Sequence, residues 1–415
     1  ADITGVPAEV VRQLGLDFFR AERAACYGRV GTSLQKFGSI TSWLLDVVNI
    51  LSGNLDKPGG AMFPVGVVPS LILNDTYDSD HPPYAKWRSR VRNLPEIGGI
   101  LPAVTLADEI TTPGRGQIRG LFTVTGNPVS SIPNSERTAA AVKSLDLMVS
   151  LDIYINETTR FADFILPTPT PARHSAFPLF SVPFMVRNYA KYAPAALDLE
   201  PGTMHDWEVL LSLGARILEQ DPGDVEESLV NDLLEKHMAG HPLCDQVKHK
   251  HARDMVGNEA GPDRLYDVLL RTSPHGDFFG AKPDGLNLQK LKDNPHGLDL
   301  GPMEPQLPAL LKTPNKKIDL TPEIIMNDVA RLDAHVPEDV LVLIGRRHVR
   351  SVNSWMNNLQ FLVKGKNPCL LLMHPDDAVR LRVKTGERVR VKSRHLSLEA
   401  LLEVTDTIRP GVLCL

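Results

Sequence analysis

Asp152 is the side chain best suited to recognise a nucleotide base. It closely follows Leu147–Ser150, an apolar run that predicts a buried strand. A carboxylate at a strand end offers two acceptors side by side, and guanine presents two adjacent N–H donors on its base-pairing edge. Asp152 is therefore a candidate for binding guanine. The alternative, from spacing alone, is that Asp152 caps the short helix expected after it.

Two glycine-containing turns also stand where strands are expected to end. One is Tyr27–Gly31, which includes Gly28, and the other is Gly126-Asn127. In a doubly wound sheet, ligands bind beyond the carboxyl ends of the strands, where neighbouring loops converge. Glycine lets the backbone approach a phosphate closely, and exposed turn amides can donate hydrogen bonds to it. Both turns are candidates for phosphate contacts, although a Gly-Asn-Pro turn alone also occurs without a ligand.

A basic loop near the C-terminal end is a further candidate. It contains Gly345, Arg346, Arg347, His348, Arg350 and Asn353. Guanidinium and amide groups suit a phosphate-bearing ligand. A solvated charged loop is the alternative.

Several other polar residues have plainer explanations. Asp206 opens a predicted helix, where a carboxylate complements the helix dipole. His174 is typical of a surface histidine. One polar stretch carries metal-ligand side chains, namely His237, His241, Cys244, His249 and His251. No apolar framework surrounds this stretch, which favours an exposed insertion, so we assign no metal ligand there and leave metal binding open.

The elements expected to position the candidate residues form an α/β fold. Their expected order is a helix over 7–23, a strand over 24–28, a helix over 34–51, a strand over 120–124, a helix over 135–145, a strand over 147–150, a short helix over 157–161, a strand over 164–166 and a helix over 205–218. A helix between two strands makes them parallel neighbours with a right-handed crossover. Residues 56–115 are rich in proline and glycine and are expected to form a long loop.

The pattern divides the chain into three parts. Residues 1–220 are expected to form a Rossmann-like parallel-sheet domain, 221–335 a helical and loop connector, and 336–415 a small β-barrel. The barrel strands are predicted over 340–346, 369–374, 388–394, 398–404 and 411–415, with a helix over 375–382.

The composition excludes several classes of protein. A net charge of -5 and a pI near 6.2 argue against a nucleic-acid or anionic-membrane surface. No apolar run is long enough to span a bilayer. Four separated cysteines exclude a disulfide scaffold and any iron–sulfur or zinc site built from clustered cysteines. They favour a reducing, cytoplasmic compartment, but any export signal would precede Ala1, so localisation stays open.

The two ends of the sequence indicate a fragment. It opens at Ala1 without a methionine, and it stops at Val412–Leu415, an apolar run of strand type with no turn residues behind it. We therefore expect more chain on both sides.

Several motifs together resemble the molybdopterin oxidoreductases of the dimethyl sulfoxide reductase family, with formate-dehydrogenase-like relationships. In chain order they are Gly5–Glu9, Tyr27–Thr32, Leu51–Gly60, Thr125–Pro128, Ala162–Pro167, Thr313–Leu320, Ile344–Asn353 and His374–Ala378. Their order and spacing carry the resemblance, which runs over nearly the whole chain. It implies that the last domain is a double-psi-type β-barrel.

The resemblance also implies a molybdenum bis(molybdopterin guanine dinucleotide) cofactor bound between the domains. Tyr27 and Gly31 would approach a dinucleotide, Asn127 would lie on its phosphate side and Asp152 at the guanine. The loop Ile344–Asn353 would lie over the pterins.

Two further nucleotide contacts are implied at His174 and Asp206. The family usually has an acidic residue beside the first of these positions, where this chain has Arg173 and Ser175. That departure makes His174 the weaker assignment.

The parts that carry the chemistry in this family are absent from the sequence. The iron–sulfur cysteines and the molybdenum ligand lie N-terminal to Gly5 in the aligned order, and the closing part of the barrel should follow Leu415. Cys26 does not match the metal-ligand position, so we assign no catalytic or metal-ligating residue and expect no activity from this chain alone. The substrate, and molybdenum versus tungsten, stay undecided.

Three functions account for these residues. The first is two-electron redox chemistry on a small molecule, of the formate dehydrogenase or nitrate reductase type, with an electron-transfer partner or subunit. The second is a molybdenum-free structural or electron-transfer subunit that keeps the fold. The third, an unrelated nucleotide-binding protein with an appended barrel, is disfavoured because no G-x-x-x-x-G-K-[ST] or G-x-G-x-x-G motif follows a strand.

Overall fold

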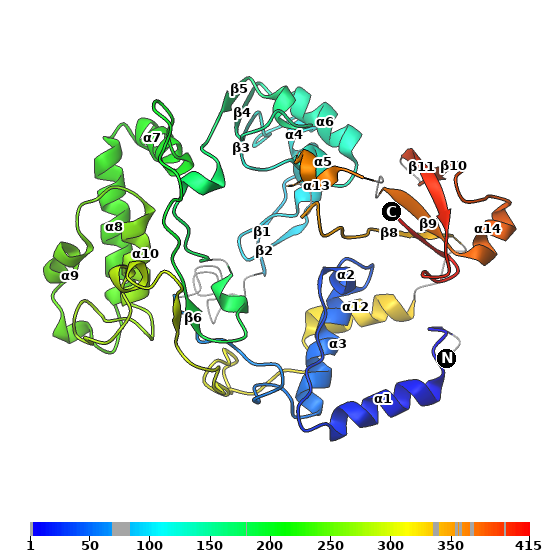
Figure 1. Ribbon diagram of the computed structural model, residues 1–415, viewed down its shortest axis with the longest axis horizontal. Coiled ribbons are helices and arrows are strands. Elements are labelled where there is room, and N and C mark those ends of the chain that lie inside the picture. The colour runs from blue at the N-terminus through cyan, green and yellow to red at the C-terminus, as the bar shows by residue number, and fades with distance from the viewer. Residues whose placement is uncertain are drawn as a thin grey trace. The chain divides into compact units, whose positions relative to one another are not determined.

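The computed structural model divides the chain into two units. It describes residues 3–68, 84–179, 181–334, 340–352, 356, 359–365, 369–393 and 396–415. Unit 1 is Ala1–Ala330 and unit 2 is Arg331–Leu415, and each combines helices with β-structure (Figure 1). Within the described ranges, no helix has the length and apolar character that crossing a membrane requires.

A three-stranded parallel sheet in unit 1 forms the predicted α/β layer. Its elements are β3 (Gly120–Val124), α5 (Pro128–Ser131), α6 (Ser135–Lys143), β4 (Leu147–Leu151), η2 (Thr159–Phe161) and β5 (Phe164–Leu166). The sheet order is β3-β4-β5 and both pairings are parallel, which confirms the three predicted strands and their direction. Val129 of α5 and Val142 of α6 pack on one face of the sheet against Met148, and all three are buried.

The segment expected as a strand before this sheet is not one. Residues 24–29 form no strand, and Tyr27 is 74% exposed. Instead, the Asn49 side chain pairs with the backbone of Cys26: Nδ2 donates to the carbonyl at 2.8 Å, and Oδ1 accepts from the N–H at 2.8 Å. Because a helix side chain satisfies this backbone, no neighbouring strand is required.

Two of the first three helices were predicted, and a short third one, α2, lies partly in the segment predicted as a turn. They are α1 (Ala8–Arg20), α2 (Val30–Ser33) and α3 (Gly38–Leu51). The helix expected from Leu34 begins only at Gly38. A Cβ at Gly38 would lie 1.9 Å from the Ser33 carbonyl oxygen, so the chain can turn this closely into α3 only at a glycine.

The region predicted as a long loop contains regular elements in its described part. They are β1 (Tyr84–Arg88), β2 (Pro95–Ile97), η1 (Ala103–Thr105) and α4 (Leu106–Thr111). The buried carboxylate of Glu96 accepts hydrogen bonds from the N–H groups of Trp87 and Gly99, at 3.1 and 3.2 Å. A single acidic side chain thus holds the antiparallel β1–β2 pair, which apolar periodicity could not indicate.

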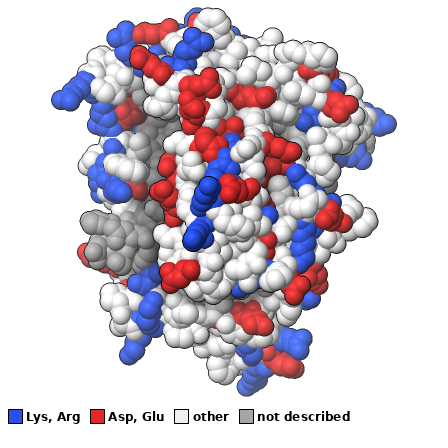
Figure 2. Space-filling model, turned by 90° about the vertical axis from the view of Figure 1, so that its left-hand side faces the viewer, with Lys and Arg blue, Asp and Glu red and all other residues white. Residues whose placement is uncertain are grey.

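A helical region follows the sheet, as predicted. Its elements are η3 (Pro171–Arg173), η4 (Val182–Phe184), β6 (Tyr189–Ala190), α7 (Asp206–Leu218), α8 (Pro222–Met238), η5 (Cys244–Gln246), α9 (His249–Val256), α10 (Pro262–Arg271), α11 (Leu288–Lys292), β7 (Leu298–Asp299) and α12 (Glu323–Asp333). Buried Val230, Leu234 and Val268 join α8 to α10. On the face seen in Figure 2, acidic and basic side chains are interspersed.

Unit 2 contains the five strands and the helix predicted for the barrel. Its elements are β8 (Val342–Ile344), α13 (Gln360–Val363), β9 (Leu370–Met373), α14 (Pro375–Leu381), β10 (Arg388–Lys392), β11 (Ser397–Val404) and β12 (Val412–Cys414). They form one mixed, curled sheet in the order β10-β11-β9-β12-β8, with Leu371, Leu402 and Leu413 in its core. The chain is thus an α/β protein with a parallel sheet and a half-barrel sheet.

Candidate nucleotide-binding site

The two turns predicted to bind a nucleotide lie at adjacent strand ends in unit 1. Val124, the last residue of β3, pairs in register with Leu151, the last residue of β4. The Thr125 N–H extends this pairing by donating to the Leu151 carbonyl at 2.9 Å, and its φ of 48° then turns the chain. Asn127 and Asp152 therefore follow neighbouring strands at the carboxyl edge of the sheet, where ligands bind in such folds.

The Asn127 side chain is hydrogen-bonded at both of its polar atoms. Nδ2 donates to Glu157 Oε2 at 2.8 Å, and Oδ1 accepts from Thr158 Oγ1 at 2.7 Å. Thr158 is fully buried, and its Oγ1 also accepts from the Val129 N–H at 3.0 Å. These bonds fix the turn after β3 against the loop after β4. One Nδ2 hydrogen and one Oδ1 lone pair remain, in an orientation that the turn already sets.

Asp152 is 9% exposed and uses both carboxylate oxygens. Oδ1 accepts from the Tyr154 N–H at 3.0 Å, and Oδ2 accepts from Asn156 Nδ2 at 3.0 Å. The bond to Tyr154, two residues on, is an Asx turn. The next helix, η2, begins only at Thr159 with no side-chain cap, so the alternative role of Asp152 as a helix cap is wrong. A carboxylate has about four lone-pair positions, so each oxygen can accept a second donor.

Asn156 connects the two strand ends. Besides holding Asp152, its Oδ1 accepts from the N–H groups of Thr158 and Thr159, at 2.9 and 3.0 Å. A continuous series of hydrogen bonds therefore runs from Asp152 through Asn156 and Thr158 to Asn127. Asn156 was not predicted as part of the site. Its position in a run of short polar residues beyond a strand, each able to bond nearby backbone, is the signal that could have indicated it.

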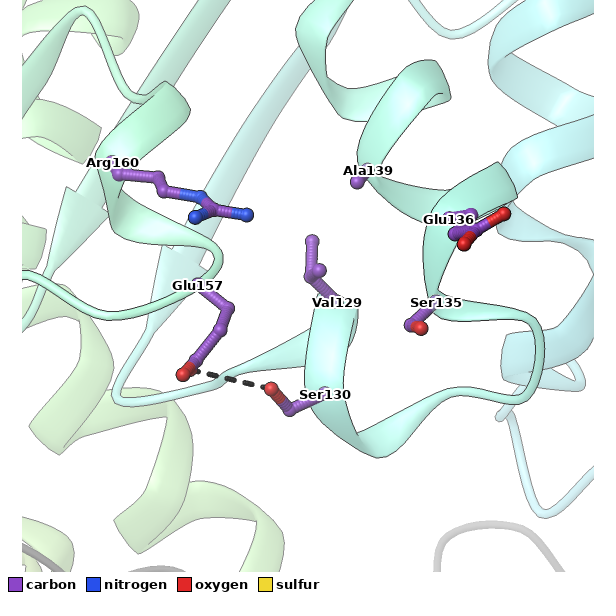
Figure 3. A pocket seen from close by; sticks show the side chains of 7 residues that line it. All are labelled: Val129, Ser130, Ser135, Glu136, Ala139, Glu157 and Arg160. Carbon is purple, nitrogen blue, oxygen red and sulfur yellow. Dashed lines mark hydrogen bonds between the residues drawn. The ribbon is translucent and has the colours of Figure 1, made fainter. Parts of the chain in front are cut away.

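An open hollow of about 390 Å³ lies beside this hydrogen-bonded loop (Figure 3). It is lined by Val129, Ser130, Ser135, Glu136, Ala139, Glu157 and Arg160. Figure 3 shows Glu157 bonded to Ser130 and the Arg160 side chain on the same side of the hollow. The hydrogen bond from Asn127 is the main cause of a lowered pKa at Glu157, with further contributions from its own backbone N–H, Ser130 and Arg160. Because the walls carry both carboxylates and a guanidinium, their charge favours no single class of ligand.

His174 and Asp206 lie close together in unit 1. His174 Nδ1 lies 3.9 Å from Asp206 Oδ1 and 3.3 Å from His205 Nδ1. His205 is the N-cap of α7, and its N–H donates to Glu208 Oε2 at 2.6 Å in a capping box. The Asp206 carboxylate also takes part in the helix start, because its Oδ1 accepts from the Trp207 N–H at 2.9 Å. Its side chain is 40% exposed, so it is accessible to a ligand.

A network of hydrogen bonds and an ion pair, centred on Asp263, holds the residue next to His174 and was not predicted. Asp263, at the start of α10, accepts from Ser175 Oγ at 3.3 Å and from the Tyr192 hydroxyl at 2.8 Å, and Lys292 Nζ lies 2.9 Å from the same carboxylate. Burial, aided by the bond and charge of Asp263, raises the pKa of Tyr192, so this hydroxyl stays protonated and donates. The residue next to His174 is thereby tied to α10. These groups are far apart in sequence, and no local motif signals them.

The Tyr27–Gly31 turn packs and bonds with α2 and α3. Gly31 lies within α2, and a Cβ at Gly28 would meet Leu45 of α3 at 2.3 Å. Among the described residues, no hydrogen bond joins this turn to Asn127 or Asp152. Its role in binding stays a prediction.

The predicted basic loop belongs to unit 2. Gly345, Arg346, Arg347, His348 and Arg350 are all exposed. The Arg346 N–H donates to the Leu415 carbonyl at 2.9 Å, which anchors the loop beside β12, and the Arg350 N–H donates to His348 Nδ1 at 3.3 Å. Asn353 lies outside the described residues. The loop offers several cationic donors to solvent, and its binding role also stays a prediction.

Comparison with known families covers both regions. The molybdopterin oxidoreductase family matches residues 26–171, which include Asn127 and Asp152. The family described as Molydopterin dinucleotide binding domain matches residues 341–415, which include the basic loop. The dimethyl sulfoxide reductase family of molybdopterin oxidoreductases fits both matches.

The relatives of this chain are distant in sequence. Trimethylamine-N-oxide reductase of Haemophilus influenzae is 20% identical over 100% of this chain and 51% of the relative. The F420-dependent formate dehydrogenase 2 subunit alpha of Methanococcus maripaludis is 23% identical over 99% of this chain and 56% of the relative. The solved structure of acetylene hydratase from Pelobacter acetylenicus shares the fold, with a TM-score of 0.67 at 14% identity, over 100% of this chain and 56% of that one. The chain thus spans about half the length of the curated relatives it matches.

The residues in place fit the nucleotide end of a molybdopterin dinucleotide. Asp152 is a largely buried carboxylate whose two oxygens are oriented by the chain and retain lone pairs. The turn at Gly126 and Asn127, with its oriented Asn127 amide, follows the neighbouring strand. This donor and acceptor set suits a base with two adjacent N–H groups joined to a phosphate.

The histidine-rich stretch, in its described residues, is not arranged as a metal site. In the described ranges, no group of three or more His, Cys, Asp or Glu side chains could hold a metal ion. His241 instead stacks on Phe278 with ring centroids 3.9 Å apart, and its Nδ1 accepts from the Leu243 N–H. Burial and the nearby Lys282 lower the pKa of His241. This histidine contributes to helix packing.

Proposed function

We propose that this chain binds molybdenum bis(molybdopterin guanine dinucleotide) as part of an oxidoreductase acting on a small molecule. The observation that carries the proposal is the pair of strand ends at Asp152 and Asn127, which hydrogen bonds lock together beside a parallel sheet. Relatives that are formate dehydrogenases and trimethylamine-N-oxide or dimethyl sulfoxide reductases by name support this class of reaction. The formate dehydrogenase or nitrate reductase type is the specific activity we propose.

Each residue of the candidate site has a role in this proposal. Asp152 accepts the N1 and N2 hydrogens of guanine, and the turn at Gly126 and Asn127 approaches the phosphates. His174 and Asp206 contact the nucleotide from α7 and the segment before it. The basic loop of unit 2, in a double-psi-type barrel, contacts the pterins.

The cofactor, when bound, supplies two-electron redox chemistry at its metal. The residues of this chain bind and orient it, and we propose none of them as catalytic. For the whole protein we further propose an iron–sulfur centre that passes the electrons on singly. A relative named as an alpha subunit supports a partner subunit as their destination.

The competing candidate is a molybdenum-free subunit that keeps the fold. The full-length protein, purified from a host that makes the cofactor, distinguishes the two. We expect molybdenum or tungsten by elemental analysis, and GMP after acid hydrolysis, in the proportion that a bis(dinucleotide) cofactor requires. A folded, metal-free and nucleotide-free protein would contradict the proposal and favour the subunit. Release of CMP in place of GMP would contradict the guanine assignment alone.

A further inference from the structure

We propose that Asn156 is a positioning residue that sets the preference of Asp152 for guanine and couples this residue to the turn at Asn127. The inference rests on the proposed function, because it takes Asp152 as the residue that binds the base. In this proposal, the Asn156 side chain aligns both nucleotide contacts, the one at Asp152 and the one at Asn127.

The two ends of the Asn156 side chain have different tasks. Nδ2 donates to Asp152 Oδ2 at 3.0 Å, while Oδ1 accepts from the N–H groups of Thr158 and Thr159. Thr158 and Thr159 are both fully buried, so the acceptor end is held by a rigid part of the loop. The donor end therefore reaches the carboxylate from a fixed point.

The donor end restrains a rotation that Asp152 would otherwise have. The terminal torsion of an aspartate is broad and has no strong preference of its own. One oxygen is bonded by the Tyr154 N–H, and a single bond leaves the carboxylate plane free to turn about it. The second bond, from Asn156, fixes the plane. Recognition of guanine requires this, because both oxygens must meet N1–H and N2–H together.

The same side chain connects base recognition to the phosphate turn. Asn156 holds the Thr158 backbone, and the Thr158 hydroxyl donates to Asn127 Oδ1 at 2.7 Å. A displacement of Asn156 therefore shifts both the plane of the Asp152 carboxylate and the anchor of Asn127. The position of the base contact relative to the phosphate contact is therefore set by Asn156.

The variant Asn156→Asp separates the two tasks. A carboxylate at this position can still accept from the Thr158 and Thr159 N–H groups, so the loop keeps its backbone bonds. It cannot donate to Asp152, and it places a second negative charge against Oδ2. Two carboxylates in contact share a proton at low pH, which restores a donor between them. Binding by this variant should therefore recover as the pH falls.

The test is equilibrium binding of GMP and IMP to the full 415-residue chain by calorimetry. IMP lacks the 2-amino group, so the ratio of the two affinities reports the second hydrogen bond to Asp152. We expect the wild type to prefer GMP by about tenfold, a ratio typical of one hydrogen bond to a charged group. In Asn156→Asp at neutral pH, this ratio should fall to near one.

A matched control adds the same charge to another Asx turn. Asn315 Oδ1 accepts from the Lys317 N–H at 3.0 Å, so Asn315→Asp keeps that turn and should keep the wild-type ratio. If Asn156→Asp does not fold, judged by circular dichroism, Asn156→Ser provides the same test. Serine keeps an oxygen for the loop N–H groups but is too short to reach Asp152.

Asp152→Asn distinguishes failure of this inference from failure of the proposed function. If the wild type does not bind GMP, or if Asp152→Asn keeps the wild-type preference, the guanine assignment is wrong and the role of Asn156 falls with it. If Asp152→Asn loses the preference and Asn156→Asp keeps it, only the role of Asn156 is overturned. An equal weakening of GMP and IMP in Asn156→Asp would also overturn it, since that result indicates a purely structural residue.

Discussion

The two ligand loops predicted for this protein differ in how their side chains are held. At the end of β4, both oxygens of Asp152 and both polar atoms of Asn156 are hydrogen-bonded within unit 1. In unit 2, Arg347 and Arg350 stand exposed on the basic loop, where the Arg350 N–H donates to His348 Nδ1. The unit 1 loop is therefore ordered by its own hydrogen bonds before a ligand binds, whereas the unit 2 loop contributes mainly positive charge.

This difference indicates a division of labour. A side chain that is already fixed loses little conformational entropy on binding and can discriminate between similar ligands. Exposed arginines lose more entropy when they are ordered, and they attract phosphates through a charge that salt screens. We therefore expect selectivity from the unit 1 loops and salt-dependent affinity from the unit 2 loop.

Removing the Thr158 hydroxyl should have the largest effect on stability. Thr158→Val leaves the buried Val129 N–H and the partly buried Asn127 Oδ1 without this partner. We expect unfolding of unit 1 to become easier by about 2–3 kcal/mol, the cost of unsatisfied buried polar groups. Urea denaturation measures this, and Thr158→Ser, which keeps the hydroxyl, should lose far less. Equal losses in the two variants would show that the loop is not held by this hydroxyl.

Neutralising the basic loop should weaken anion binding without affecting stability. For Arg347→Ala with Arg350→Ala, we expect inorganic pyrophosphate to bind about three- to tenfold more weakly at low salt, and the difference to shrink at high salt. The unfolding free energy should change by less than about 0.5 kcal/mol. Titration calorimetry at two salt concentrations tests both statements.

Arg388→Ala is the matched control for the basic loop. Arg388 lies on β10, at the opposite edge of the sheet from β8, and is also exposed. Its loss should leave pyrophosphate binding unchanged. If it weakens binding as much as the loop variant does, the effect is one of general charge.

The smallest expected effect concerns Glu157 and appears only in acid. Its pKa is lowered in the folded protein, chiefly by the hydrogen bond from Asn127, so the folded state binds a proton less readily than the unfolded state. This contribution to stability is present above the unfolded-state pKa of about 4.3 and is lost as the pH falls below it. Because Glu157 is largely exposed, we expect less than about 1 kcal/mol.

Glu157→Gln should flatten this part of the stability profile between pH 3 and 6, a window of about three units around the ordinary glutamate value. Thermal unfolding at a series of pH values measures it. An unchanged slope in the variant would show that Glu157 makes no such contribution.

Apolar runs made the sheets predictable, and side-chain bonds to backbone made the remainder unpredictable. The strands β3, β4 and β5 and the five strands of unit 2 have apolar segments bounded by turns, and their places were predicted. The segment at Cys26 has the same appearance, but Asn49 satisfies its backbone. Glu96 has the opposite effect: its carboxylate stabilises a pair of strands that no apolar pattern predicts.

The candidate site shows the same limit. Asp152 was predictable because a carboxylate after a buried strand is chemically conspicuous. Asn156 was not, because its importance comes from contacts that exist only once the loop has folded. The pairing of Asp263 with Ser175 and Tyr192 spans distant parts of the sequence, so no local pattern could indicate it.

The central claim, that Asp152 recognises guanine, is tested most directly by comparing GMP and AMP binding in the wild type and in Asp152→Asn. The substitution replaces one acceptor with a donor that faces the N–H groups of the base. A bidentate pair is worth about 1–3 kcal/mol, so GMP should bind about 5- to 150-fold more weakly in the variant, while AMP binding stays weak and unchanged. Equal affinities of the wild type and the variant for GMP would contradict the account.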